Sequence, residues 1–189
     1  GKTFVSLNLA HTISSTNNKV LLVGADLHNP QIHSYLNIEK HKNGLTDFLV
    51  DKKNDWKKLL LKPNSSLNFD ILLAGTMPPN PVQLLNNGNL NLLIKEAEKK
   101  YDYIVFDTPP CLLVSDTFSI AKMADLFLFV VRCNHTKTDV LDFIKDSHNK
   151  GLLKSNSMFV LNGLETDKKI KYGYSDKYNY GYGYGYASD

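Results

Sequence analysis

The sequence predicts an α/β fold, in which a mostly parallel central sheet lies between helices in three α/β/α layers. Two observations predict this class. Short apolar runs of strand length alternate with longer segments of helix length, which is typical of βαβ units. In addition, 42% of the 189 residues are hydrophobic, enough for one domain with a sizeable core.

The expected elements follow one another along most of the chain. Residues 3–15 have enough apolar positions for one buried helix face, and residues 20–23 form the fully apolar run expected of a central parallel strand. Three prolines exclude regular structure over residues 75–81, because proline removes a hydrogen-bond donor and fixes φ. The other expected elements are short helices at 44–50 and 55–61, a strand at 69–73, a helix at 90–100, strands at 103–106 and 126–131, a helix at 136–150 capped by Thr136, and a strand at 158–161.

Polar residues stand at or just beyond the ends of four of these strands, namely Asp26, Asp107, Arg132 and Asn162. Ligands of parallel sheets bind at the carboxyl ends of the strands. Two carboxylates there suit Mg²⁺, which favours oxygen ligands, and they could also supply a base for an attacking hydroxyl. Each taken alone, Asp26 and Asp107 could equally be turn residues.

The chain opens with Gly1, Lys2 and Thr3 directly before the first helix, which is the pattern that ends a phosphate-binding loop. Backbone N–H groups would face a β-phosphate, Lys2 would contact β- and γ-phosphate oxygens, and the Thr3 hydroxyl would bind Mg²⁺. Three residues can match by chance, and the glycines that would extend the pattern lie outside the sequence. Because no Met precedes this half-motif, we expect the sequence to be part of a longer chain.

Charge and cysteine usage narrow the classes of function. The 22 basic and 19 acidic residues are too balanced to favour a nucleic-acid partner. Cys111 and Cys133 are expected to be buried free thiols in a reducing, cytoplasmic setting. The six histidines form no zinc-ligand spacing with them. No run of the sequence approaches the roughly 20 apolar residues that cross a bilayer.

The last segment, residues 172–189, carries seven of the ten tyrosines, alternating with Gly, Asn and Ser. It has too little apolar surface to offset its ordering entropy, so we expect it to be disordered. Phosphorylation would add about −1.5 to −2 charges to each tyrosine and turn the segment into a switch for assembly. An unmodified, adhesive low-complexity tail is the alternative. The predicted phosphorylation sites are Tyr172, Tyr174, Tyr178, Tyr180, Tyr182, Tyr184 and Tyr186.

Together these segments resemble the bacterial tyrosine kinases of capsule and exopolysaccharide biosynthesis (BY-kinases), a branch of the deviant P-loop ATPases near MinD and ParA. Residues 22–30 are similar to the Walker A′ motif of that family, and residues 103–110 have the form of a Walker B strand. The other similar segments are residues 78–85, 130–136, 160–163 and the tyrosine-rich tail. The similarity extends over nearly the whole chain.

The resemblance implies a P-loop NTPase domain at residues 1–170, which lacks its first strand and the start of Walker A, and an autophosphorylated tail at residues 171–189. It implies a ring of subunits in which each tail enters a neighbouring site. A transmembrane regulator of polysaccharide chain length, fused upstream or separate, and a tyrosine phosphatase would be partners. The kinase would act at the cytoplasmic face of the inner membrane.

The resemblance also assigns roles to individual residues. Mg²⁺ would be held by Thr3 and Asp107, and Asp26 would assist metal binding or activate the tyrosine hydroxyl. Lys2 would be catalytic together with both aspartates. The implied ATP-binding residues are Gly1, Lys2, Thr3, Arg132 and Asn162.

Three positions depart from the family pattern. In the A′ motif, usually Asp-x-Asp-x-Arg, Gly24 replaces the first Asp and His28 the Arg, and Gln83 replaces a Glu further on. We expect activity nonetheless, because Asp26 and Asp107 remain. Two alternatives stay open: a MinD/ParA-like ATPase without kinase activity, and a degenerate interaction module that binds no ATP.

Overall fold

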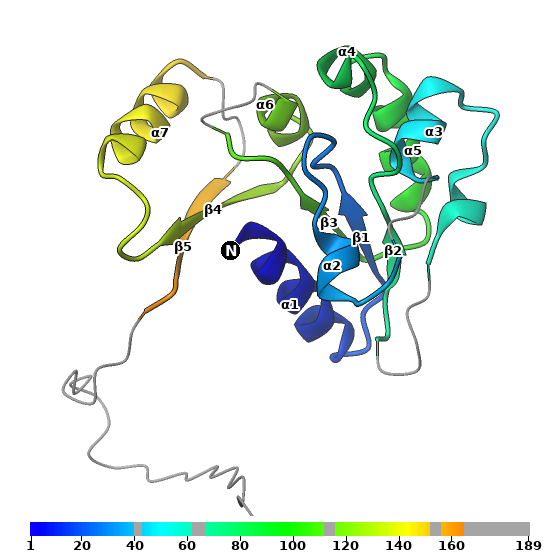
Figure 1. The fold of residues 1–189 in the computed structure, drawn as a ribbon, viewed down its shortest axis with the longest axis horizontal. Helices are drawn as coiled ribbons and strands as arrows, with labels where there is room; N and C mark the ends of the chain where they lie inside the picture. The colour runs from blue at the N-terminus through cyan, green and yellow to red at the C-terminus, as the bar shows by residue number, and fades with distance from the viewer. Residues whose placement is uncertain (40–42, 62–66, 112–115, 152–155, 165–189) are drawn as a thin grey trace, which may run out of the picture.

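Two parallel sheets form the centre of the fold (Figure 1). The first has the order β2-β1-β3, with β1 at Val20–Gly24, β2 at Asp70–Leu72 and β3 at Tyr103–Asp107. The second pairs β4 (Leu126–Arg132) with β5 (Asn156–Asn162). The predicted α/β class with parallel strands is confirmed, but the strands expected in one sheet are divided between two.

The computed structural model describes residues 1–39, 43–61, 67–111, 116–151 and 156–164. The tyrosine-rich tail and its seven predicted phosphorylation sites lie outside these residues, so its disorder stays a prediction. Within the described ranges, no helix combines the length and apolar character needed to cross a membrane.

Helices cover both faces of the first sheet. One face packs Leu21, Val23 and Leu72 against α3 and α5, and the other packs Leu22 and Ile71 against α1 and α2. This arrangement gives the three predicted layers, because alternate residues of a strand point to opposite faces. The helices are α1 (Lys2–Ser14), α2 (Ile32–Tyr35), α3 (Leu45–Val50), α4 (Pro81–Leu85), α5 (Asn89–Ala97), α6 (Asp116–Ala121) and α7 (Asp139–Asn149), with a 3₁₀ helix, η1, at Trp56–Leu59.

Several local predictions need correction. The helix expected at 136–150 begins at Asp139, because the Thr136 hydroxyl accepts the Arg132 N–H at 2.9 Å instead of capping a helix. The short helices α2, α4 and α6 were not predicted. Cys111 and Cys133 are thiols outside any disulfide, as expected, but they are only partly buried.

Helix α1 meets the sheet through small side chains. Its buried residues are Ser6, Ala10 and Ser14, at intervals of four. The expected apolar face is therefore only partly correct: Ala10 is buried, but Phe4 is 49% exposed. Residues of this size let a helix axis approach a sheet closely, because little side-chain volume separates the two backbones.

A cleft of about 1200 Å³ separates the two sheets. It is lined by β3, by β4 and by the side of α1 that carries Val5, Leu9 and Ile13. Among the described strands, β3 has a partner only in β1, and β4 only in β5. Both strands therefore present unpaired backbone groups at an edge.

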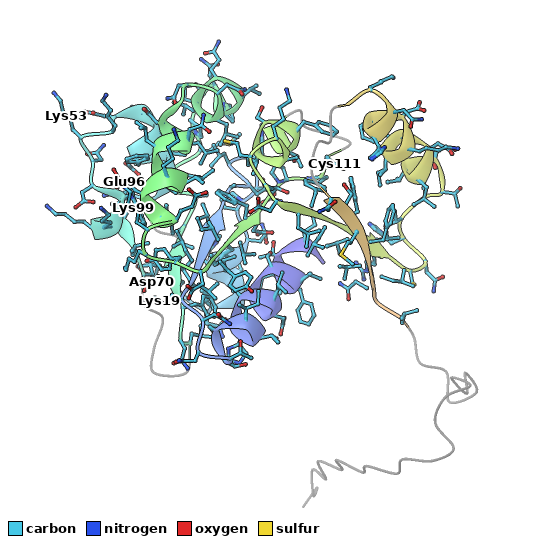
Figure 2. All side chains as sticks on the ribbon, turned by 180° about the vertical axis from the view of Figure 1, so that it is seen from behind. Lys19, Lys53, Asp70, Glu96, Lys99 and Cys111 are labelled. Atoms are coloured by element: carbon cyan, nitrogen blue, oxygen red, sulfur yellow. The ribbon has the colours of Figure 1, made fainter. Side chains whose placement is uncertain are left out.

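Charged groups also gather at the amino ends of the strands of the first sheet, where Figure 2 labels Lys19 and Asp70. Asp70 and Lys19 lie at the amino ends of the strands, where Lys100 Nζ contacts Asp70 Oδ2 at 3.1 Å and Tyr101 donates its hydroxyl to the same oxygen. Burial, followed by this Asp70 contact, raises the pKa of Tyr101 to about 12. These polar groups satisfy one another, whereas the predicted site residues lie at the opposite, carboxyl ends.

Candidate active site at the carboxyl ends of the strands

Strands β1 and β3 bring two carboxylates to one edge of the first sheet. Gly24 pairs in register with Asp107, and the Ala25 N–H donates to the Asp107 backbone oxygen at 2.8 Å. Asp26 follows directly, and its side chain borders the same small pocket as Asp107. Two residues that are 81 positions apart (107 − 26) thus lie together because their strands are hydrogen-bonded neighbours.

Asp107 is the most deeply buried of the predicted site residues, with 3% of its surface exposed. Burial raises its pKa above the ordinary value, while hydrogen bonds from the Thr3 and Ser6 hydroxyls lower it. The Ser6 Oγ donates to Asp107 Oδ1 at 2.9 Å. A carboxylate that is desolvated but held by two hydroxyl groups is a strong candidate ligand for a cation.

Asp26 has two structural roles at once. Its Oδ1 accepts the backbone N–H groups of His28 at 3.2 Å and Asn29 at 2.9 Å, as a turn residue does. Its charge is also close enough to act on Asp107. The two interpretations that the sequence left open for Asp26 are therefore compatible.

Gly24, which replaces the first aspartate of the A′ pattern, stands in a confined place. A Cβ at this position would lie 3.1 Å from the Ala74 backbone nitrogen and 3.2 Å from Ile32 Cδ1. Those neighbours would have to move by a few tenths of an ångström to accept a side chain. The glycine that replaces the family's aspartate thus occurs where neighbouring atoms leave little space for a side chain.

The start of α1 lies beside the two carboxylates. Gly1 is the N-cap, Lys2 and Thr3 form the first turn, and no acidic residue occurs in that turn. The Lys2 charge acts on Asp107, and the Thr3 hydroxyl binds it. A helix N-terminus with N–H groups that no side chain of the described residues caps is suited to bind an anion such as phosphate.

The second sheet delivers Arg132 and Asn162 to the same region. The two residues pair across β4 and β5, and Arg132 lines the cleft together with Gly1 and Lys2. A Cβ placed on Gly1 would overlap with Asn162 Nδ2. The structure therefore brings all seven predicted nucleotide and metal residues to one region, with the start of α1 between the two sheets (Figure 1).

Sequence reasoning missed Ser6, which contacts the central carboxylate. One signal could have indicated it: small residues recur at positions 6, 10 and 14, so Ser6 lies on the face of α1 that approaches the sheet. It also missed His33 and Gly75, which line the pocket beside Asp26 and Asp107. Nothing in the local sequence connects those two residues with the site.

The donor set fits a magnesium–nucleotide complex. Thr3, Asp26 and Asp107 offer oxygen atoms, and Mg²⁺ in phosphate sites typically takes one or two carboxylates and completes its shell with phosphate and water. Lys2 and the N–H groups of α1 offer positive charge for the phosphates. Among the described residues, no three His, Cys, Asp or Glu side chains gather as a metal cage.

Comparisons with known proteins point in one direction. The profile of a family described as an AAA domain matches residues 1–156. The chain is 33% identical over 175 residues to the tyrosine-protein kinase YwqD of Bacillus subtilis, covering 92% of this chain and 72% of that protein. Over 174 residues it is 37% identical to a protein from the cps region of Klebsiella pneumoniae that is named for tyrosine-protein kinase function. That match covers 92% of this chain but only 23% of the relative.

Solved structures of other proteins share the fold of this chain. The kinase domain of the Escherichia coli tyrosine kinase ETK superposes with a TM-score of 0.77 at 28% identity, over 97% of this chain and 67% of that one. The fold is also shared with the septum site-determining protein MinD of Pyrococcus horikoshii in complex with Mg-ADP. This likeness has a TM-score of 0.66 at 23% identity, over 85% of this chain and 64% of that one.

Proposed function

The chain belongs to the bacterial tyrosine-protein kinases with a P-loop ATPase fold, and we propose that it uses ATP and Mg²⁺ to phosphorylate the tyrosines of its own tail. One observation carries this proposal: buried Asp107 lies beside Asp26, the Thr3 hydroxyl and the Lys2 charge at the start of α1. This is the set of groups that phosphoryl transfer requires, namely positioning groups and fixed charge.

Each site residue would have a role that follows from its position. Lys2 and the N–H groups of α1 would bind the phosphates, and Thr3 and Asp107 would hold Mg²⁺, which would supply positive charge to the phosphate oxygens. Asp26 would either assist metal binding or activate the tyrosine hydroxyl. Arg132 and Asn162, at the carboxyl ends of β4 and β5, contact the remainder of the nucleotide.

The chemical step transfers one phosphoryl group. The tyrosine oxygen forms a bond to the γ-phosphorus while the bond from that phosphorus to the β-γ bridging oxygen breaks, and ADP leaves. The phenolic proton passes to a carboxylate, for which Asp26 is the candidate because it borders the pocket beside Asp107. A positioned base contributes about 10²–10⁴-fold to such a step.

Mass spectrometry of a longer chain that includes the loop before Gly1 tests this function. After incubation with MgATP we expect phosphate on the tail tyrosines from Tyr172 to Tyr186, and none in a Lys2→Met variant. Hydrolysis of ATP without phosphotyrosine would favour the MinD/ParA-like ATPase instead. Failure to bind ATP would favour the interaction module.

We also propose that a strand from a segment before Gly1 completes the domain by inserting between β3 and β4. The support is the cleft of about 1200 Å³, the two facing strand edges, and the apolar side chains of α1 that line it. An inserted parallel strand would pair both edges and bury Val5, Leu9 and Ile13. Hydrogen exchange tests it: amides of β3 and β4 should exchange more slowly in the longer chain, and equal rates would contradict the insertion.

The chain spans less than a quarter of the length of its Klebsiella relative. We propose a ring of subunits that exchange tails, a transmembrane chain-length regulator that holds the kinase at the cytoplasmic face of the membrane, and a phosphatase that resets the tail. Exposed Phe159, Leu161 and Leu164, just before the tail, offer apolar surface for such contacts. Sedimentation of phosphorylated and unphosphorylated protein would test the ring, which should dissociate on phosphorylation.

A further inference from the structure

Ser6 is a buried hydroxyl whose partner is a carboxylate on another element. It lies on α1 with 8% of its surface exposed, and its Oγ is 2.9 Å from Asp107 Oδ1. Its Oγ is also 2.9 Å from the Lys2 carbonyl and 3.4 Å from the Thr3 carbonyl. Helical serines commonly donate to such carbonyls of their own preceding turn.

Ser14, two turns further along the same face, shows that ordinary pattern. It is also buried, and its Oγ donates to the His11 carbonyl at 2.8 Å. The hydroxyl of Ser14 thus donates within its own helix. Ser6 differs from Ser14 in that its hydroxyl also contacts a side chain on another element, Asp107.

A serine hydroxyl has one proton and can serve one of its three acceptors at a time. An ionised carboxylate attracts that proton more strongly than a peptide carbonyl does. While Asp107 is charged, the Ser6 proton therefore points to Oδ1. This bond fixes the orientation of the carboxylate from the α1 side.

We propose that Ser6 is a positioning residue that aligns the Asp107 carboxylate for Mg²⁺ and so connects the phosphate-binding end of α1 with strand β3. The proposal rests on the proposed binding of Mg²⁺ and nucleotide. Ser6 follows Thr3 by almost one helical turn, so the two hydroxyls lie on the same side of α1, where both bind Asp107. Groups that orient a metal ligand in this way typically contribute 10–100-fold to metal affinity.

Calorimetry with ADP tests this role in the longer chain that includes the loop before Gly1. ADP binding is titrated at a series of Mg²⁺ concentrations and again in EDTA. For Ser6→Ala we expect the Mg²⁺ concentration for half-maximal enhancement to rise about 10-fold, with ADP affinity in EDTA unchanged. Alanine favours helix, so α1 should remain intact. Ser6→Thr, which keeps a hydroxyl, should restore the wild-type Mg²⁺ dependence.

Ser14→Ala is the matched control, because it removes a buried hydroxyl of the same helix that donates to the His11 carbonyl and not to Asp107. It should leave both titrations unchanged. An unaltered Mg²⁺ dependence in Ser6→Ala would overturn the positioning role, and so would an equal loss of affinity in Mg²⁺ and in EDTA. If the wild-type chain itself shows no Mg²⁺-dependent ADP binding, the proposed function fails, and the role of Ser6 fails with it.

Discussion

The two sheets contribute to one site but are buried to very different degrees. All five residues of β1 are buried, whereas most residues of β5 are exposed. The first sheet has helices on both faces, while α6 and α7 cover one face of the second through a small cluster around Phe129 and Ile144. The acidic half of the site thus stands on a well-packed base, and the half with Arg132 and Asn162 on a less covered one.

This difference in burial predicts which property a mutation in each sheet should change. Substitutions of the carboxylates at the edge of the first sheet should change the rate of phosphoryl transfer, because neighbouring groups already hold these side chains in place. Changes within that sheet should act on stability. Changes in the second sheet should act mainly on nucleotide affinity, since its side chains have less packing to lose.

The largest effect is expected at Asp107. Asp107→Asn keeps the shape of the side chain but removes the charge that would bind Mg²⁺, so we expect tail phosphorylation to fall by about 100-fold or more. A radiolabel assay with ATP measures the loss. Activity near the wild-type level would remove Asp107 from the site and break the distinction between the two sheets.

The core of the first sheet should give the largest loss of stability. Leu22 is fully buried in β1, so Leu22→Ala should lower the free energy of unfolding by about 2–5 kcal/mol. In β5, Phe159 is 56% exposed and stacks on Phe129 with 5.6 Å between ring centroids, so Phe159→Ala should lower it by about 1 kcal/mol. Urea unfolding followed by circular dichroism compares the two, and equal losses would contradict unequal burial.

A smaller effect is expected at Arg132. Removal of its guanidinium in Arg132→Ala should raise the KM for ATP about 10-fold, the loss of one charged hydrogen bond. The rate at saturating ATP should change little, because Arg132 is proposed to bind the nucleotide and not to take part in phosphoryl transfer. Steady-state kinetics separate KM from kcat, and a loss confined to kcat would place Arg132 in the chemistry instead.

The smallest effect concerns stability and pH. The folded-state pKa of Asp107 is raised, chiefly by burial, so its negative charge destabilises the nucleotide-free protein above that pKa. This destabilisation disappears as the pH falls below the value for the unfolded chain, where Asp107 is protonated in both states. Asp107→Asn should therefore unfold at a higher urea concentration than wild type at pH 7, and the difference should shrink towards pH 4. A lower midpoint at pH 7 would show that the hydrogen bonds to the charged form outweigh burial.

Much of the fold could be predicted because the signals are local. The apolar run at residues 20–23 and the polar residues after the strands are readable from spacing alone, and the α/β class is confirmed. The start of α7 was not, because the Thr136 hydroxyl binds the Arg132 N–H in a local turn, which competes with its use as a helix cap. The buried face of α1 was also misjudged, since its small residues, rather than its largest apolar ones, meet the sheet.

The sequence by itself determined the class of fold, the aspartates after the strands and the lysine at the start of the first helix. The tertiary structure decided that Asp26 and Asp107 border one pocket, that Ser6 binds Asp107, and that the strands form two sheets with a cleft between them. The physical reason is that a strand's pattern specifies which faces are buried but not which strand lies beside it. Ser6 and Asp107 are 101 residues apart, and only the packing of α1 on β3 brings them within hydrogen-bond distance.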